Sequence, residues 1–298
     1  MPESAPHIAV CICTLNRPVL LKRLLDRLAG QETGGRFTYS VIVADNDAGR
    51  SAEAIVAEAA SRSPVEIRYA SEPRRNIALA RNMALRHADG SFAAFIDDDE
   101  FPEPGWLAAM LGTCEAFGVA GVLGPVRPHF EEPPPQWIID GRFCERPEYP
   151  TGRVMPWDEC RTGNVLFRRD LIEDAATAFD PAFGTGGEDK DFFMRMTDLG
   201  HVFLWCNEGV VYETVPKDRW TRGYMLRRAL LRGQNIVKHP VGKVGLVARS
   251  LVATPVYLAV LPFAYLSGQH VFMKYCIKLC DHVGRILAVV GLNPVVER

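Results

Sequence analysis

The amino-acid sequence predicts an α/β fold with a mostly parallel β-sheet flanked by helices, followed by C-terminal helices associated with a membrane. Short apolar runs alternate with amphipathic stretches through the first hundred residues, and the runs are apolar on both faces, as in parallel strands covered on both sides. Near the other end, no Asp, Glu, Lys or Arg occurs from Ser250 to Met273, about 24 residues, which is enough to cross a hydrocarbon core.

Residues 8–96 are expected to contain four strands and three helices. Pro18 suits the first turn of a helix, and leucines at helical spacing follow it. The expected strands are residues 8–14, 39–44, 65–69 and 92–96, and the expected helices are residues 18–28, 51–61 and 77–87. Ligands of such sheets gather at the carboxyl ends of the strands.

The pattern is less regular after residue 96. A helix over 105–117 and a strand over 119–123 precede a Pro-rich segment, 125–150, which is expected to be a long irregular loop. A strand over 161–168 and a helix from Asp170 should follow. A helix from Glu188 should end at Gly200, and strands over 202–205 and 209–213 should complete the region. The residues expected to be buried on that helix are Phe192, Phe193, Met196 and Leu199.

Two regions are expected: residues 1–215, with halves 7–123 and 124–215, and a basic and apolar helical region, 216–298. The chain has 298 residues, 34 Lys plus Arg, 36 Asp plus Glu and a net charge of -2, so its overall field gives no reason to expect nucleic acid as a partner. Its eight cysteines show no C-x-x-C spacing typical of a zinc site, and reduced thiols are expected. The residues before His7 do not resemble a signal peptide.

Four acidic residues, Asp97, Asp98, Asp99 and Glu100, directly follow the apolar run 92–96. Carboxylates packed this closely repel one another unless a cation or hydrogen-bond donors satisfy them. Oxygen ligands of this kind select Mg²⁺ or Mn²⁺, which keep open positions for phosphate oxygens. A divalent-cation site is therefore expected here, and a solvated acidic turn is the alternative.

A second acidic pair, Glu188 and Asp189, begins a helix after Gly186 and Gly187. Acids in a first turn are favoured by the helix dipole, so a helix cap is one interpretation. The two glycines also permit a close backbone approach, which would bring a carboxylate over the strand ends as a general base.

Two further positions could contact a nucleotide. Arg75 or Arg81, in the segment 74–82, could bind a diphosphate, although a solvated basic helix fits equally well. Asp45 follows the second strand, where an acid can accept a hydrogen bond from a nucleoside or simply form a turn.

Taken together, these elements resemble glycosyltransferase family 2, the inverting transferases of the GT-A (Rossmann-like) fold, and most closely its bacterial exopolysaccharide branch of the succinoglycan kind. The resemblance covers most of residues 7–235. It rests on the ordered combination of segments 10–17, 41–46, 76–82, the acidic strand end, 162–164 and 187–189.

The resemblance implies roles for individual residues. Asp45 would contact the nucleobase, Arg81 the base or diphosphate, Asp97 the ribose side and Asp99 the metal, and Asp189 would be the catalytic base. Other donor-binding residues would be Thr14, Asn16, Arg17, Arg75 and Asp98, and the acceptor side would contain Trp157, Thr162, Gly163, Asn164 and Glu188. Many relatives place a metal-binding His after the last strand; this chain has Glu213 there as the expected third ligand.

The resemblance also implies the reaction. A sugar would move from a nucleoside-diphosphate sugar, expected to be a UDP-sugar, to a lipid-linked or oligosaccharide acceptor in surface polysaccharide synthesis. Mn²⁺ or Mg²⁺ on Asp99 and the side chain of Arg81 would neutralise the leaving diphosphate. Asp189 would deprotonate the acceptor hydroxyl, and attack from the opposite face would invert the anomeric configuration.

Other functions remain open at this point. A nucleotidyltransferase shares the sheet and metal but normally has a glycine-rich loop after its first strand, where this chain has Thr14 to Pro18. A phosphohydrolase with an aspartyl nucleophile would need its acid there, too. A non-catalytic membrane scaffold would explain the C-terminal region but not the acids.

The C-terminal region is expected to hold the enzyme on the cytoplasmic face of a bacterial inner membrane. Basic residues between Lys217 and Arg249 should attract anionic head groups. Pro255 and Pro262 favour a kinked, re-entrant or interfacial segment over a straight spanning helix, and residues 275–290 have the pattern of an amphipathic surface helix. The alternative is that these segments form core or the interface of a homo-oligomer.

Overall fold

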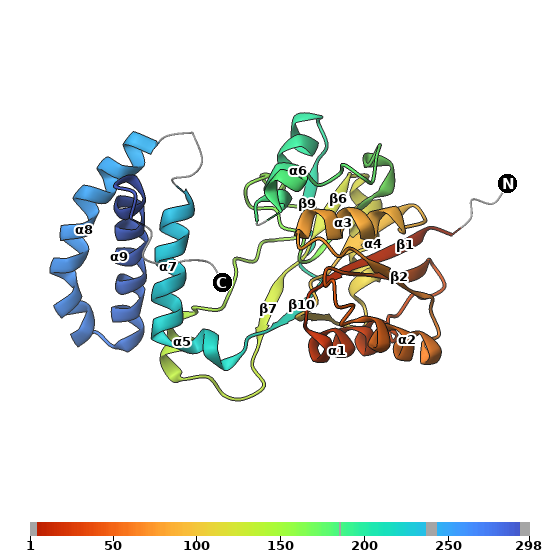
Figure 1. Cartoon of the computed structure of the whole chain (residues 1–298), viewed down its shortest axis with the longest axis horizontal. Coiled ribbons are helices and arrows are strands. Elements are labelled where there is room, and N and C mark those ends of the chain that lie inside the picture. The colour runs from red at the N-terminus through yellow and green to blue at the C-terminus, as the bar shows by residue number, and fades with distance from the viewer. Residues whose placement is uncertain (1–4, 185, 237–242, 293–298) are drawn as a thin grey trace. The chain divides into compact units, whose positions relative to one another are not determined.

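The computed structural model describes residues 5–184, 186–236 and 243–292. The chain forms two compact units (Figure 1). The α/β unit contains Met1–Pro128 and Arg146–Thr214, and the helical unit contains His129–Glu145 and Val215–Arg298. Residues 129–145 belong to the helical unit, whereas the sequence had placed them in the region that ends at residue 215. Part of the basic run, residues 237–242, lies outside the described residues.

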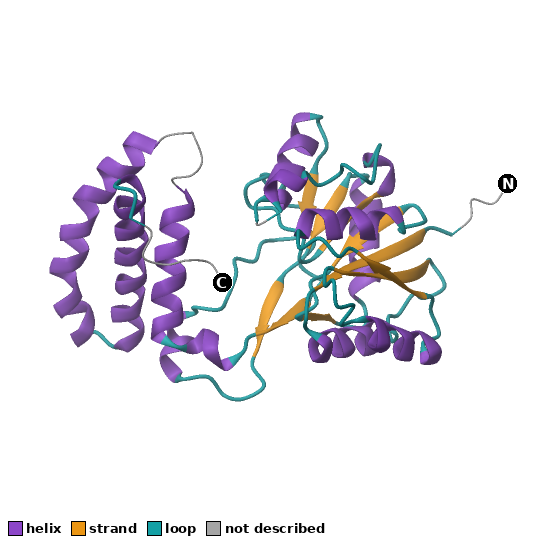
Figure 2. Cartoon of the chain, in the orientation of Figure 1, coloured by secondary structure: helices purple, strands orange, loops and turns teal. Residues whose placement is uncertain are grey.

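A seven-stranded, mostly parallel sheet forms the centre of the α/β unit, which confirms the predicted fold class (Figure 2). The strand order is β3-β2-β1-β4-β8-β6-β9, and β8 runs antiparallel to both β4 and β6. The strands are β1 (His7–Thr14), β2 (Thr38–Asp45), β3 (Ile67–Ser71), β4 (Phe92–Phe95), β6 (Gly121–Leu123), β8 (Val165–Arg168) and β9 (Phe203–Trp205). A second sheet has the order β5-β10-β7. Its strands are β5 (Glu100–Pro102), β10 (Val211–Thr214) and β7 (Val126–His129).

Helices cover both faces of the large sheet because its strands alternate between two apolar cores. In β1, Ile8, Val10 and Ile12 face the core shared with α1 and α4, whereas Ala9 and Cys11 face the core shared with α3 and α6. Figure 1 shows α1 and α2 on one side of the sheet and α3 and α6 on the other. The helices are α1 (Pro18–Leu28), α2 (Glu53–Arg62), α3 (Ile77–Arg86), α4 (Trp106–Phe117) and α6 (Glu188–Asp198).

Three local expectations were wrong. The Pro-rich segment 125–150 contains strand β7 and a short helix, α5 (Gln136–Gly141). The helix expected from Asp170 is a single 3-10 turn, Arg169–Leu171, because side chains bind the following backbone: Asp174 accepts from the amide of Ala176, and Asn82 bonds both the amide and the carbonyl of Phe179. Leu199, expected to be buried, is 70% exposed because it caps α6 at its C-terminal end.

The helical unit consists mainly of α7 (Arg222–Ile236), α8 (Lys243–Leu266) and α9 (Gln269–Val289). Helix α9 packs against α7, α8 and α5. Helix α8 continues through Pro255 and Pro262, the two prolines that were expected to favour a kinked, re-entrant or interfacial segment.

Asn164 connects four segments of the α/β unit at the carboxyl ends of β6 and β9. Its side chain donates to the carbonyls of Pro125 and Gly209 at 3.0 and 2.8 Å and accepts from Trp106 Nε1 at 2.8 Å. Asn164 is 3% exposed and Trp106 is fully buried. The side-chain bonds of Asn164 are thus made to the scaffold, which gives it a structural role besides its expected place on the acceptor side.

Asn164→Ala should therefore destabilise the protein by about 2–4 kcal/mol, because it leaves the Trp106 indole and two buried carbonyls without these bonds. The loss would be measured by urea unfolding. Asn207→Ala is the matched control, since its side chain makes a longer, 3.4 Å bond to Trp205 Nε1 near the surface. A change equal to that of the control would contradict the structural role.

Candidate active site

The polar residues singled out in the sequence gather at one edge of the large sheet. Thr14 and Asp45 end β1 and β2, which pair with each other in parallel, and Asp97 follows β4. Strand β8 is antiparallel but begins at this same edge, because Val165 pairs with Phe95. Thr162, Gly163 and Asn164 precede it, so the topology brings these segments together where ligands of parallel sheets bind.

The four acids form a tight turn between β4 and β5. The amide of Glu100 donates to the Asp97 carbonyl at 3.0 Å, and the amide of Asp97 donates to Glu100 Oε2 at 3.2 Å. The turn continues into β10, because the Thr214 amide donates to the Asp99 carbonyl at 2.8 Å. Backbone bonds on both sides therefore fix the position of the acidic side chains.

Residues of the loop after β1 neutralise part of this charge. Thr14 Oγ1 donates to Asp98 Oδ2 at 2.8 Å, and Arg17 Nη1 lies 2.8 Å from Asp98 Oδ1 and 3.1 Å from Asp99 Oδ2. Asn16 bends the loop with a φ of 54°, in the left-handed region that asparagine tolerates. Thr14 and Arg17 thus contact the acids directly, and their expected contacts with the donor remain predictions.

Asp97 and Glu100 lie beside Gly163. A Cβ atom on Gly163 would approach to 2.7 Å from Asp97 Oδ2 and 3.0 Å from Glu100 Oε1, so only glycine fits here without displacing a carboxylate. Burial, together with the neighbouring carboxylates, raises the pKa of Asp97 to about 6 against the opposing effect of Arg81. Burial and the charge of Asp97 raise the pKa of Glu100 well above its usual range.

Arg146 faces the same acids from the Pro-rich segment. Its guanidinium forms an ion pair with Glu213 and also interacts electrostatically with Glu100 and Asp97. Register places Glu213 opposite Glu100 across the β5–β10 pair. Glu213 therefore has a cationic partner within the chain, and its role as a metal ligand stays a prediction.

The acidic turn has features that suit a hard divalent cation. Glu100 Oε1 is buried and makes no hydrogen bond with the described residues, and the nearby side-chain oxygens are carboxylates. In the part of the chain that the structure describes, no three His, Cys, Asp or Glu side chains form a ready-made metal cage. The residues present thus fit a Mg²⁺ or Mn²⁺ ion that takes one or two protein carboxylates and fills its other positions with water and phosphate oxygens.

Asp45 is fully buried, and its carboxylate organises the loop after β2. Its oxygens accept from the amides of Asp47 and Ala52 at 3.1 and 2.9 Å and from the Tyr69 hydroxyl at 3.1 Å. The neighbouring Asn46 bonds the carbonyls of Glu72 and Arg74, which ties this loop to the start of α3. The nucleobase contact expected of Asp45 remains a prediction.

Helix α3 positions the beginning of α6. Asn76 caps α3 by accepting from the Leu79 amide and donates to the Pro181 carbonyl at 2.9 Å. One turn further, the buried Arg81 forms an ion pair with Glu188 and interacts electrostatically with Asp97 and Asp189. Arg81 is therefore held between the acidic turn and α6, whereas Arg75 is exposed to solvent.

Asp189 lies in the first turn of α6 as its second residue, and the helix begins after Gly187, a residue whose φ of 100° suits glycine. The other two acids of this turn face arginines: Glu188 pairs with Arg81, and Asp191 pairs with Arg195. Asp189 Oδ1 accepts from the Lys190 amide at 2.8 Å. Among the contacts of the described residues, Asp189 is therefore the only one of these three acids that forms no ion pair with an arginine.

A cavity of about 260 Å³ adjoins the acidic turn. It shares Arg146, Gly163 and Asn164 with the site, and its aromatic wall is formed by Tyr149 and Trp205, whose rings meet edge to face at 5.2 Å. Trp157, expected on the acceptor side, is 38% exposed and is not part of this lining, and Thr162 is buried. Arg146, Tyr149 and Trp205 were not expected from the sequence, because no local pattern encodes the long-range contacts that bring them together.

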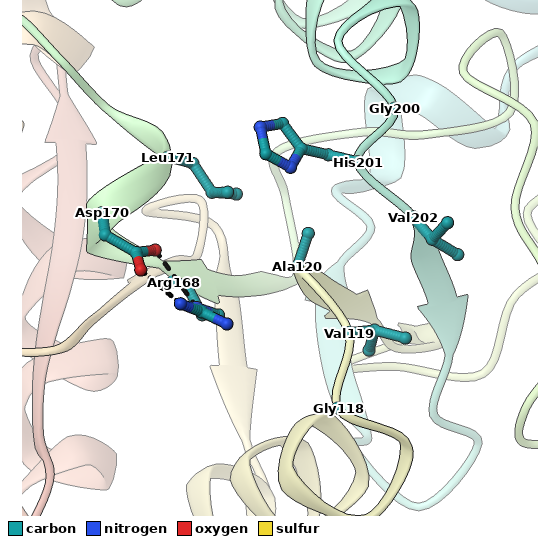
Figure 3. A pocket seen from close by; sticks show the side chains of 9 residues that line it. All are labelled: Gly118, Val119, Ala120, Arg168, Asp170, Leu171, Gly200, His201 and Val202. Carbon is teal, nitrogen blue, oxygen red and sulfur yellow. Dashed lines mark hydrogen bonds and ion pairs between the residues drawn. The ribbon is translucent and has the colours of Figure 1, made fainter.

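A second cavity, of about 430 Å³, lies at the opposite edge of the sheet (Figure 3). Its lining includes Arg168, which is paired in register with Phe92 at the start of β4. Figure 3 shows Leu171 and His201 approaching it from two sides and Arg168 paired with Asp170. Since the sheet separates this cavity from the acidic turn, we assign it no part in the reaction.

Comparison with known proteins agrees with this geometry. The model of the family described as glycosyl transferase family 2 matches residues 9–175, and the chain belongs to that family. The chain is 38% identical over 238 residues to the succinoglycan biosynthesis protein ExoM of Rhizobium meliloti, covering 78% of this chain and 75% of that protein. It is 26% identical to the glycosyltransferase AglE of Haloferax volcanii over 70% of this chain and 67% of that protein.

Solved structures show the same fold. The mannosyltransferase PcManGT from Pyrobaculum calidifontis, in complex with GDP-Man and Mn²⁺, aligns with a TM-score of 0.64 at 20% identity, covering 97% of this chain and 87% of that one. S. aureus TarS 1-349 in complex with UDP aligns with a TM-score of 0.55 at 16% identity, covering 98% and 94%. The GT-A fold expected from the sequence is thereby confirmed, and the chain is a glycosyltransferase.

The buried Glu100 gives a pH-dependent prediction. An acid whose pKa is higher in the folded state keeps its proton where the unfolded chain has lost it, so the wild type loses stability as the pH rises through that range. Glu100→Gln keeps an oxygen for the Asp97 amide and removes the buried charge. With a chelator present, the variant should have a higher urea midpoint than the wild type at about pH 8, and the difference should vanish near pH 4.

Glu115→Gln is the control for this comparison, since Glu115 is exposed in an ion pair with Arg36. If Glu100→Gln were instead less stable than the wild type at alkaline pH, Arg146 would compensate the charge of Glu100 completely.

Proposed function

We propose that the protein is a metal-dependent, inverting glycosyltransferase that moves a sugar from a UDP-sugar to a lipid-linked saccharide at a membrane. The observation that carries this proposal is the arrangement around Arg81. This one buried guanidinium interacts with Asp97 of the acidic turn and with Glu188 and Asp189 of α6. A donor-side and an acceptor-side carboxylate are thereby held at one edge of the sheet.

The acidic turn and the loop after β1 suit the donor. Asp99 is proposed to hold a Mn²⁺ or Mg²⁺ ion, with Glu213 as a further candidate, and the ion when bound would neutralise charge on the leaving diphosphate. Arg17 lies against Asp98 and Asp99 and is exposed enough to reach phosphate oxygens when they arrive. Asn16, Asp45, Arg75, Asp97 and Asp98 are the other proposed donor contacts.

Asp189 is proposed as the general base. A base must be placed near the acceptor hydroxyl, and the glycines before α6 allow the first turn of this helix to approach the strand ends. Arg81 and Glu188 anchor the turn without occupying the Asp189 carboxylate. One displacement with a single base inverts the configuration, and no second carboxylate is needed as a nucleophile.

The 260 Å³ cavity is the proposed entrance for the acceptor. Its aromatic wall, formed by Tyr149 and Trp205, offers the ring faces and edges on which sugars pack, and Asp158 and Glu159 offer hydrogen-bond acceptors for hydroxyl groups. Gly163 and Asn164 line the cavity on the side of the acidic turn, and the buried Thr162 precedes them. Trp157 is proposed to contact a part of the acceptor outside the cavity.

Location at the cytoplasmic face of the inner membrane is part of the proposal. The similarity to a succinoglycan biosynthesis protein favours an acceptor on a lipid carrier. One described helix, Gly245–Leu266, is long and apolar enough to cross a membrane. The chain from Val215 to Arg298 has thirteen Lys and Arg against three Asp and Glu, which favours an anionic surface.

Asp99→Asn tests the metal role. We expect at least about a 100-fold loss of Mn²⁺-dependent turnover, a size typical of removing electrostatic stabilisation of a leaving group, while the urea midpoint stays near that of the wild type. Turnover would be followed by nucleoside diphosphate release and Mn²⁺ binding by calorimetry. Asp26→Asn, on the exposed side of α1, is the control. Near-normal turnover at saturating Mn²⁺ would remove Asp99 from the metal site.

Asp189→Asn tests the base. It should lower kcat by about 100-fold or more and leave the affinity for the donor unchanged, because a base acts on the acceptor. Asp198→Asn, on the last turn of the same helix, is the matched control. If donor affinity collapsed instead, Asp189 would be a donor ligand, and Glu188 and Asp191 would be the next residues to test as the base.

A further inference from the structure

Helix α8 buries Ser250 and exposes large apolar side chains. Ser250 is fully buried, and its hydroxyl lies 3.0 Å from Nδ1 of the buried His282 on α9. The exposed side of α8 is formed by large apolar residues that are 52–83% exposed: Leu251, Val252, Val256, Leu258, Phe263, Tyr265 and Leu266. A helix packed in water would show the reverse pattern, so this face is suited to hydrocarbon.

Helices α8 and α9 form an antiparallel pair along most of their lengths. The contacts run from Ser250 with His282, through Tyr257 with Tyr275 at 5.8 Å, to Tyr265 with Phe272 at 5.6 Å near the turn at Gly268. Because α8 is packed against α9 in this way, α8 could enter a membrane only together with α9.

Helix α9 is too polar to cross the hydrocarbon core. It carries Lys274, Lys278, Asp281 and Arg285, and the two lysines are exposed. At 1.5 Å per residue, Lys274 and Lys278 would lie about 9 and 15 Å from the turn, so an upright hairpin would place both well inside a core of about 30 Å. Each buried charge would cost several kcal/mol, which opposes insertion along the membrane normal.

Helix α9 also packs closely against α7. Arg232 of α7 forms a two-bond ion pair with Asp281 at 2.9 and 2.7 Å. The crossing is close, since a Cβ on Gly233 would lie 2.3 Å from the Asp281 carbonyl oxygen, and one on Gly284 would lie 2.4 Å from the Leu230 carbonyl oxygen. The three helices are thus one packed body that presents the apolar face of α8.

We infer that the helical unit is monotopic. Helix α8 lies in the plane of an anionic bilayer with its exposed apolar face in the acyl boundary, and the turn at Ser267 and Gly268 stays on the side of the membrane that faces the active site. This inference rests on the membrane attachment proposed above and specifies its geometry. The exposed Arg249, Lys274 and Lys278 supply charges for the head groups along the same helix pair.

The first test uses flotation of the full-length protein with phosphatidylglycerol-containing vesicles. Val252→Asp and Phe263→Asp place a charge on the apolar face at residues 70% exposed, and each should weaken vesicle binding at least about tenfold without lowering the urea midpoint. Val19→Asp, at an 80% exposed residue of α1, should bind as the wild type does.

Failure of the wild type to float, with a dimer that Phe263→Asp converts to monomer, would assign the face to a second copy of the chain and overturn the inference. Transfer to a soluble acceptor by the same preparation would show that the enzymatic proposal survives that result.

The second test determines the side on which the turn lies. In sealed membrane vesicles of both orientations, an impermeant maleimide should label Ser267→Cys only from the face at which it labels Asp198→Cys on the α/β unit, with the labelled peptide identified by mass spectrometry. Labelling from the opposite face would show a spanning α8, and protection from both faces would show a re-entrant hairpin. Either result would overturn the monotopic arrangement while leaving membrane attachment intact.

Discussion

The buried guanidinium of Arg81 is the interaction on which the arrangement of the site depends. It is held by α3, which packs against the sheet through small residues, and it pairs with Glu188 at the start of α6 while facing Asp97 after β4. Burying either charge alone would cost free energy, and the ion pair between Arg81 and Glu188 offsets that cost for both side chains. Because three different elements meet at this one cation, a shift of any of them would move Asp189 relative to the acidic turn.

The same electrostatic constraint governs the rest of the site. Four consecutive acids at a strand end repel one another, and the chain places Arg17 on one side of them and Arg146 on the other. Neither arginine comes from the strand that carries the acids: one follows β1, and the other returns from the Pro-rich segment. The compensation is incomplete, since burial still raises the pKa of Glu100 and Asp97. A divalent cation, as proposed for Asp99, would offset negative charge on this turn and would also attract an anionic diphosphate.

The helical unit obeys a different constraint. Its helices bury polar groups such as Ser250 and His282 against one another and leave apolar side chains outside. In water this arrangement would expose a large apolar surface, and in contact with lipid it satisfies both kinds of group. The α/β unit shows the ordinary pattern, with apolar strands inside, and this difference between the two units is the basis of the membrane attachment proposed for the helical unit.

The sequence by itself determined the order of the elements up to residue 123, the acidic strand end and the family resemblance, because these depend on local periodicity and on residues adjacent in the chain. Only the tertiary structure decided which side chains meet. Arg146 and Glu213 are 67 residues apart and Arg81 and Glu188 are 107 residues apart, and no local pattern encodes such pairs. The same holds for the segment after Asp170, where long-range bonds from Asn82 prevailed over helical propensity. For α8, composition specified an apolar helix, but only its pairing with the charged α9 decided which orientations in a membrane are physically acceptable.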